Sequence, residues 1–133
     1  MAVVVDTNIV SYIFKKDTRA TLFDPHLVQV PRFLSFMSLA ELRRWELQSD
    51  WSDSKKEQFK QLLSEFGVIY ADEEHCDIWV NVTNECSRNG RPISTADAWI
   101  AAAALMFDIP LVTNNRKDFE HISGITILSG PPS

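Results

Sequence analysis

Short apolar runs that alternate with helical patterns constrain the fold of this chain more than any other feature of its sequence. The run Val3–Val5 is apolar throughout, as in a strand that is buried on both faces. Further strands are predicted at 33–36, 68–70, 111–113 and 125–128, and helices at 8–16, 39–48, 53–66, 73–88 and 96–107. Strands that alternate with helices favour an α/β fold in which a central five-stranded parallel sheet is flanked by helices on both faces.

Two stretches give weaker signals. Residues 17–32 have no clear period, although 19–23 could form a short helix before Pro25. Residues 118–121 predict one helical turn. The tail 130–133, Gly-Pro-Pro-Ser, is expected to be disordered.

The length and composition favour one globular domain over residues 1–133. The chain is 45% hydrophobic and 23% charged, which argues against a disordered protein. No apolar run reaches the ~18 residues that a membrane span needs, and the first residues do not resemble a signal peptide. We therefore expect a cytoplasmic protein. Cys76 and Cys86 are ten residues apart on one predicted helix, too far for a disulfide, so both thiols are expected to be free.

Acidic residues follow the predicted strands. Asp6 ends the first strand, Glu41 lies just after the second and Asp118 just after the fourth, while Asp97 begins the apolar helix 96–107. Parallel strands bring their carboxyl ends to one edge of a sheet, where such sheets bind ligands. We therefore expect these four carboxylates to converge.

Helix capping is the alternative interpretation of each acid. Glu41, Asp97 and Asp118 each follow a Ser or Asn by three residues, as in a capping box, and Asp6 could be an N-cap. Ser54 and Glu57 have the same spacing in an exposed helix with no strand directly before it. We interpret that pair as capping only. Capping does not require the other four acids to converge, whereas the predicted topology does.

Clustered carboxylates repel one another unless a cation lies between them, and hard oxygen ligands suit Mg²⁺ or Mn²⁺. Such a cation can activate water for attack on a phosphodiester. The net charge of −5 is unusual for a nucleic-acid binder. Without the four acids, however, 14 of the 18 acids remain against 13 Lys and Arg, so the rest of the chain is nearly neutral. The three histidines are scattered, which argues against a zinc site.

Four motifs carry a family resemblance: Val5-Asp6-Thr7-Asn8, Ser38-Leu-Ala-Glu41-Leu, Asp97-Ala-Trp-Ile-Ala-Ala and Val112-Thr113-Asn114-Asn115-Arg116-Lys117-Asp118-Phe119. Together they resemble the PIN domain, in particular the VapC-type toxins of toxin–antitoxin pairs, over residues 3 to about 128. The resemblance implies an endoribonuclease that depends on Mg²⁺ or Mn²⁺, is inhibited by a cognate antitoxin and forms a homodimer.

The same resemblance implies residue roles. Asp6 and Asp97 would be the metal ligands, Glu41 and Asp118 would complete the catalytic pocket, and Thr113 and Asn115 would order it. Several basic residues are candidates for RNA contacts, foremost Arg116 and Lys117 beside the pocket, then Lys15, Lys16, Arg43, Arg44, Arg88 and Arg91.

Two other functions are consistent with parts of the sequence. A non-catalytic RNA- or protein-binding module on the same fold would be expected to lack one of the acids, and all four are present. A phosphatase that uses Asp6 as a covalent nucleophile normally has a second aspartate two positions later, where this chain has Asn8.

Overall fold

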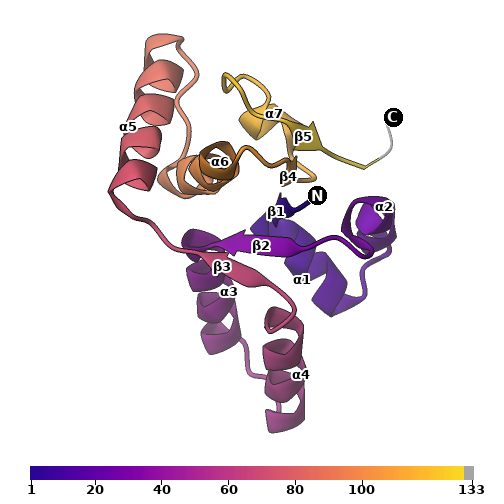
Figure 1. Cartoon of the computed structure of the whole chain (residues 1–133). Coiled ribbons are helices and arrows are strands. Elements are labelled where there is room, and N and C mark those ends of the chain that lie inside the picture. The colour runs from indigo at the N-terminus through magenta and orange to yellow at the C-terminus, as the bar shows by residue number, and fades with distance from the viewer. Residues whose placement is uncertain (131–133) are drawn as a thin grey trace.

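The computed structural model describes residues 1–130, so the predicted disordered tail lies, apart from Gly130, outside the described residues. Within them the chain forms five strands, seven α-helices and one 3₁₀ helix, η1 (Figure 1). The strands are β1 (Val3–Val5), β2 (Arg32–Ser35), β3 (Gly67–Ile69), β4 (Leu111–Val112) and β5 (Ile127–Leu128). The helices are α1 (Thr7–Lys15), η1 (Thr18–Phe23), α2 (Asp24–Leu27), α3 (Phe36–Gln48), α4 (Asp53–Leu63), α5 (Glu73–Arg88), α6 (Thr95–Phe107) and α7 (Arg116–Phe119).

The five strands form one parallel sheet in the order β3-β2-β1-β4-β5. From β1 in the centre, the chain first adds β2 and β3 on one side and then β4 and β5 on the other. The predicted α/β fold with a five-stranded parallel sheet is therefore confirmed. The strand order reverses between β1 and β4, and open α/β sheets bind their ligands at such a switch point.

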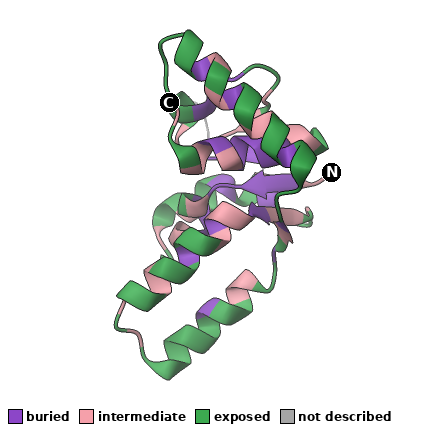
Figure 2. Ribbon diagram, turned by 90° about the vertical axis from the view of Figure 1, so that its left-hand side faces the viewer, coloured by how far each residue is buried: buried purple, intermediate pink, exposed green. Residues whose placement is uncertain are grey.

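Helices cover both faces of the sheet, as predicted (Figure 1). Successive strand residues point to opposite faces, so Val3 and Val5 belong to one hydrophobic core and Val4 to the other. Helices α1 and α3 contribute Ile9 and Leu42 to the first core, and α5, α6 and α7 contribute to the second. In Figure 2 the buried residues concentrate along the strands and along α6, whereas α4 is mostly exposed.

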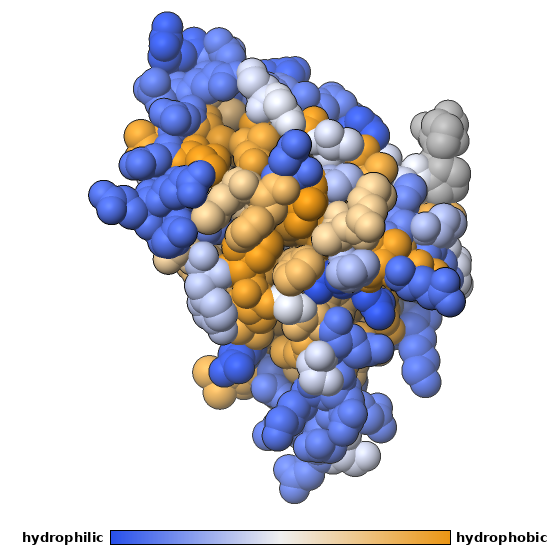
Figure 3. Space-filling view, viewed as in Figure 1, coloured by the Kyte–Doolittle hydropathy of each residue, from blue (hydrophilic) through white to orange (hydrophobic). Residues whose placement is uncertain are grey.

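Helix α6 is buried nearly all round, because its alanines 101–104 let it approach the sheet and α5 closely. The face of the molecule drawn in Figure 3 has apolar side chains gathered in its middle, with polar side chains around them.

No helix among residues 1–130 is both long enough and apolar enough to span a membrane.

Several predicted boundaries need correction. Helix α3 begins at Phe36, three residues earlier than predicted, because Ser35 ends β2 and its side chain accepts a hydrogen bond from Met37 N–H, 3.1 Å away. The ambiguous stretch 17–32 holds η1 and α2, and Pro25 lies in the first turn of α2, where a proline needs no hydrogen-bond partner. The predicted turn at 118–121 is α7, which begins at Arg116.

Candidate active site

Asp6 lies at the switch point of the sheet. It follows the last residue of β1, and its backbone N–H donates to the carbonyl oxygen of Val112, the last residue of β4. The Thr113 hydroxyl donates to Asp6 Oδ2 over 2.7 Å and accepts from the backbone N–H of Asn115 at 3.0 Å. Asp6 is 5% exposed and Thr113 is fully buried. The end of β4 therefore fixes the carboxylate that ends β1.

Glu41 reaches the same edge from α3. The Thr7 hydroxyl lies 2.7 Å from Glu41 Oε1 and 2.8 Å from the Ser38 hydroxyl. A carboxylate only accepts and a hydroxyl has one hydrogen, so Thr7 donates to Glu41 and Ser38 donates to Thr7. Because Thr7 follows Asp6 in the chain, this relay ties Glu41 to the end of β1.

Asp97 and Asp118 come from the C-terminal half of the chain. Asp97 lies half-buried in the first turn of α6, where its backbone N–H donates to the Ser94 hydroxyl at 3.1 Å. Asp118 lies exposed in α7, which follows β4 directly. The two acids line one pocket together with Lys117.

The electrostatics of the site couple all four acids. The pKa of Asp6 is raised from 3.8 to about 6, chiefly by burial and also by repulsion from Asp97 and Glu41, while the Thr113 hydrogen bond opposes the shift. The pKa of Asp97 is raised as well, first by burial and then by Asp118 and Glu41, against the Ser94 hydrogen bond. Ionisation of Asp6 and of Asp97 therefore costs free energy that a bound cation would offset.

Comparison with known proteins gives the chain a family. The family model of the PIN domain matches residues 3–125, nearly the whole chain. The chain belongs to the PIN-domain family. The predicted resemblance to VapC-type toxins is confirmed by its relatives, which include ribonuclease VapC1 of Haemophilus influenzae strain R2866, 29% identical over 127 residues that cover 94% of this chain and 95% of that protein.

Solved structures share the fold. VapBC-1 from nontypeable Haemophilus influenzae is 28% identical, with a TM-score of 0.85 over 97% of this chain and 98% of that one. VapBC2 from Rickettsia felis, solved bound to a DNA fragment from its promoter, superposes with a TM-score of 0.86 over 98% of this chain and 100% of that one. At 23% identity, this second similarity supports the fold alone.

The capping interpretation accounts for only one acid of this PIN domain. Ser94 caps α6 at Asp97 N–H as predicted, but α3 is capped by Ser35, and Ser38 lies inside that helix. The side chains of Asp6 and Asn115 occupy N-cap positions without making a capping hydrogen bond. Helix capping therefore does not explain Asp6, Glu41 or Asp118.

The comparison pair at Ser54 needs a correction too. Helix α4 is capped by Ser52, whose hydroxyl accepts from Lys55 N–H at 3.2 Å, so Ser54 is not the N-cap. Glu57 is nevertheless an exposed acid on a helix outside the sheet edge. It remains suitable as a control for the four acids.

The carboxylates of this PIN domain fit a hard divalent cation by their chemistry. All four offer oxygen ligands, and neither of the two salt bridges among residues 1–130 involves any of them. As the side chains lie, no three His, Cys, Asp or Glu residues in the described chain are close enough to ligate one ion. Mg²⁺ needs only one or two protein carboxylates, since it keeps several of its waters. Two of these carboxylates, with the other two acids nearby, are therefore enough to suit a bound Mg²⁺ ion.

Further polar residues of the PIN domain lie around the four acids. Sequence reasoning missed Thr7 and gave Ser38 the wrong role, although the i, i+3 spacing of Ser38 and Glu41 on one helix face was a usable signal. Arg116 donates to the carbonyl oxygen of Ile127 at 3.3 Å, which holds its exposed side chain near β5. Arg91 and His121 line the pocket beside Asp97 and were not assigned to it from the sequence.

Proposed function

We propose that this chain is a metal-dependent endoribonuclease, the toxin of a VapBC-type pair, which hydrolyses RNA phosphodiesters in the acidic pocket. The buried hydrogen bond from Thr113 to Asp6 at the switch point is the observation that carries this proposal. It holds a carboxylate with a raised pKa at the sheet edge beside Asp97 and Glu41, an arrangement that costs free energy unless a cation binds. The relatives named ribonuclease support the same activity.

In this proposal Asp6 and Asp97 hold Mg²⁺ or Mn²⁺, and Glu41 and Asp118 complete the pocket. When bound, the cation supplies an activated water and neutralises charge that develops on the phosphate. Thr113 fixes the orientation of Asp6, with Asn115 N–H fixing Thr113 in turn. Thr7 fixes Glu41 in the same way. Arg116 and Lys117, on the helix that carries Asp118, bind phosphate groups of the RNA.

The cleavage of RNA tests this assignment. Mg²⁺ or Mn²⁺ should support cleavage of a total tRNA preparation, and EDTA should abolish it. Asp6→Asn and Asp97→Asn should each reduce the rate by a factor of about 100 or more, in keeping with the loss of an essential electrostatic group.

Glu57→Gln is the matched control, since it removes one acid from exposed α4, and it should leave the rate unchanged. Undiminished cleavage by Asp6→Asn would refute the site. RNA binding without cleavage by the wild-type protein under any metal would favour the non-catalytic module instead.

The proposed partners follow from the family. A VapC-type toxin is inhibited by a cognate antitoxin, and solved structures similar to this chain are named as VapBC pairs. We include in the proposal that the toxin forms a homodimer, that it acts in the cytoplasm, where its RNA substrate is found, and that residues 1–133 act as one domain.

A further inference from the structure

A pocket of about 230 Å³ opens beside the proposed metal site, between the loop that joins α5 to α6 and helix α7. Asp97 and Asp118 line it on the side of the acids. The remaining lining residues are not part of the proposed catalytic group: Arg91, Pro92, Ile93, Ser94, Lys117 and His121. The pocket therefore extends the site from the acids toward the candidate RNA contacts Arg91 and Lys117 and toward His121, which has no role so far.

Positive charge gathers in this extension. Arg91 and Lys117 are exposed, and neither takes part in the salt bridges that the structure shows among residues 1–130. Ser94 is the N-cap of α6, so the positive end of that helix dipole also lies at the pocket. Because the acids would be neutralised by a bound cation, the extension would then attract anions.

His121 adds a hydrogen-bonding group that lacks a partner. Both of its ring nitrogens are buried, and neither has a hydrogen-bond partner within the described part of the chain. A neutral imidazole always carries one N–H donor, and a buried donor that is left unpaired costs free energy. Because His121 is one of the residues that line the pocket, a change of its rotamer would be needed to turn a ring nitrogen toward a ligand there, and the donor would then gain a partner.

We propose that this pocket binds a backbone phosphate of the RNA next to the scissile one, through Arg91, Lys117 and His121. This inference rests on the proposed function and deepens it by placing a binding site for the RNA backbone on the α7 side of the acids. Two cationic side chains, a helix N-terminus and a free donor match a phosphate, which offers only acceptors and negative charge. The expected contribution is affinity without sequence preference, as for other phosphate contacts.

Binding of a fluorescein-labelled, mixed-sequence single-stranded RNA tests the proposal, measured by anisotropy in Mg²⁺. All variants are made in the Glu41→Gln protein, which keeps both proposed metal ligands, Asp6 and Asp97, and lacks an acid that completes the catalytic pocket, so that the RNA stays intact while binding is measured. Arg91→Ala and Lys117→Ala should each weaken binding roughly 3- to 10-fold and lower the slope of log affinity against log salt by about 1. His121→Leu should weaken binding, and His121→Gln, which keeps a donor, should restore most of it.

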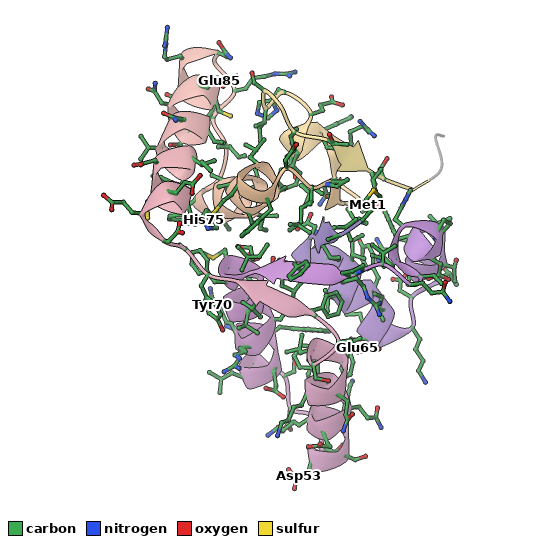
Figure 4. The ribbon with its side chains drawn as sticks, viewed as in Figure 1. Met1, Asp53, Glu65, Tyr70, His75 and Glu85 are labelled. Carbon is green, nitrogen blue, oxygen red and sulfur yellow. The ribbon has the colours of Figure 1, made fainter. Side chains whose placement is uncertain are left out.

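Lys56→Ala is the matched control, because it removes the same charge from α4, whose first residue, Asp53, lies at the end of the molecule away from Glu85 in Figure 4. It should leave the affinity and the salt slope unchanged. An equal effect of Lys56→Ala would overturn the proposal in favour of general attraction, and so would a failure of the Glu41→Gln protein to bind RNA.

A metal-ligand role for His121 is separated by a second measurement. Mn²⁺ binding to the chain with Asp6 intact, followed by calorimetry, should be the same for His121→Leu as for the wild type. Weaker Mn²⁺ binding would show that His121 is a ligand of the cation, and the proposed phosphate site would then be wrong. If Asp97→Asn abolishes cleavage but the Arg91, Lys117 and His121 variants bind RNA as tightly as their parent protein, the phosphate site is wrong and the proposed function still holds.

Discussion

Asp6 shows how one residue is shaped by its place in the sheet. The all-apolar strand that precedes it is fully buried, so the carboxylate that ends the strand is buried with it. Burial and neighbouring acids favour its protonated form, whereas the Thr113 hydroxyl favours the ionised form. Burial prevails, and the pKa lies near 6. The residue is thereby poised to exchange a proton for a cation near neutral pH.

This shift makes the stability of the metal-free protein depend on pH. Because the folded-state pKa of Asp6 lies above the unfolded value of 3.8, its favourable contribution is complete below pH 3.8 and is lost as the pH rises through about 6. At pH 7.5 in EDTA, Asp6→Asn should therefore be more stable than the wild type by on the order of 2 kcal/mol. Urea unfolding at pH 3.5 and pH 7.5 measures this difference.

The comparison of the two pH values serves as the internal control, since the advantage of the asparagine variant should disappear at pH 3.5. Glu57→Gln should show no such pH-dependent gain. An Asp6→Asn protein that is less stable than the wild type at pH 7.5 would mean that the Thr113 hydrogen bond outweighs burial.

At the scale of elements, two helices offer a matched pair of caps. Ser94 caps α6 and Ser52 caps α4, each by accepting one backbone N–H, over 3.1 and 3.2 Å. Ser94→Ala and Ser52→Ala should each lower the free energy of unfolding by about 1 kcal/mol. Only Ser94→Ala should also slow RNA cleavage, because the first turn of α6 carries Asp97.

Chemical denaturation and the initial cleavage rate, measured on both variants, test this prediction. The capping contribution would be common to both, so the ratio of their cleavage rates isolates the positioning of Asp97. Equal cleavage rates would indicate that Asp97 keeps its orientation without the cap.

The strength of the sequence signal explains which elements could be predicted. Val3–Val5 is apolar throughout, which suits a strand of a parallel sheet that is covered on both faces. The helix of alanines that follows Asp97 is apolar nearly all round, which suits a helix buried against such a sheet. The start of α3 was misplaced because Ser35 and Ser38 are both plausible caps in sequence, and only the tertiary packing of β2 selects Ser35. The convergence of the acids followed from topology, whereas the contacts of Thr7 and the pocket beside His121 depend on side-chain placement that no spacing specifies.

The whole molecule brings together two sets of elements on the two sides of β1. The strands β2 and β3 lie on one side, and β4 and β5 on the other, with the acids drawn from both sets. A cation held by Asp6 and Asp97 would therefore join β1 to α6, which pack against each other. Metal binding and folding should consequently be linked.

That linkage predicts a metal-dependent melting temperature. In calorimetry at pH 7.5, Mn²⁺ at 100 times its dissociation constant should stabilise the wild type by about 2.7 kcal/mol. Asp6→Asn and Asp97→Asn should lose most of this gain, and Glu57→Gln should keep it. A gain that survives in Asp6→Asn would place the ion elsewhere on the chain.

The hydrogen bond between Thr113 and Asp6 joins residues 107 positions apart. During synthesis the first strand and its carboxylate leave the ribosome long before the threonine that fixes that carboxylate, and before the acid of α7. In a nascent chain the proposed catalytic centre therefore cannot be complete before β4 and α7 have been made.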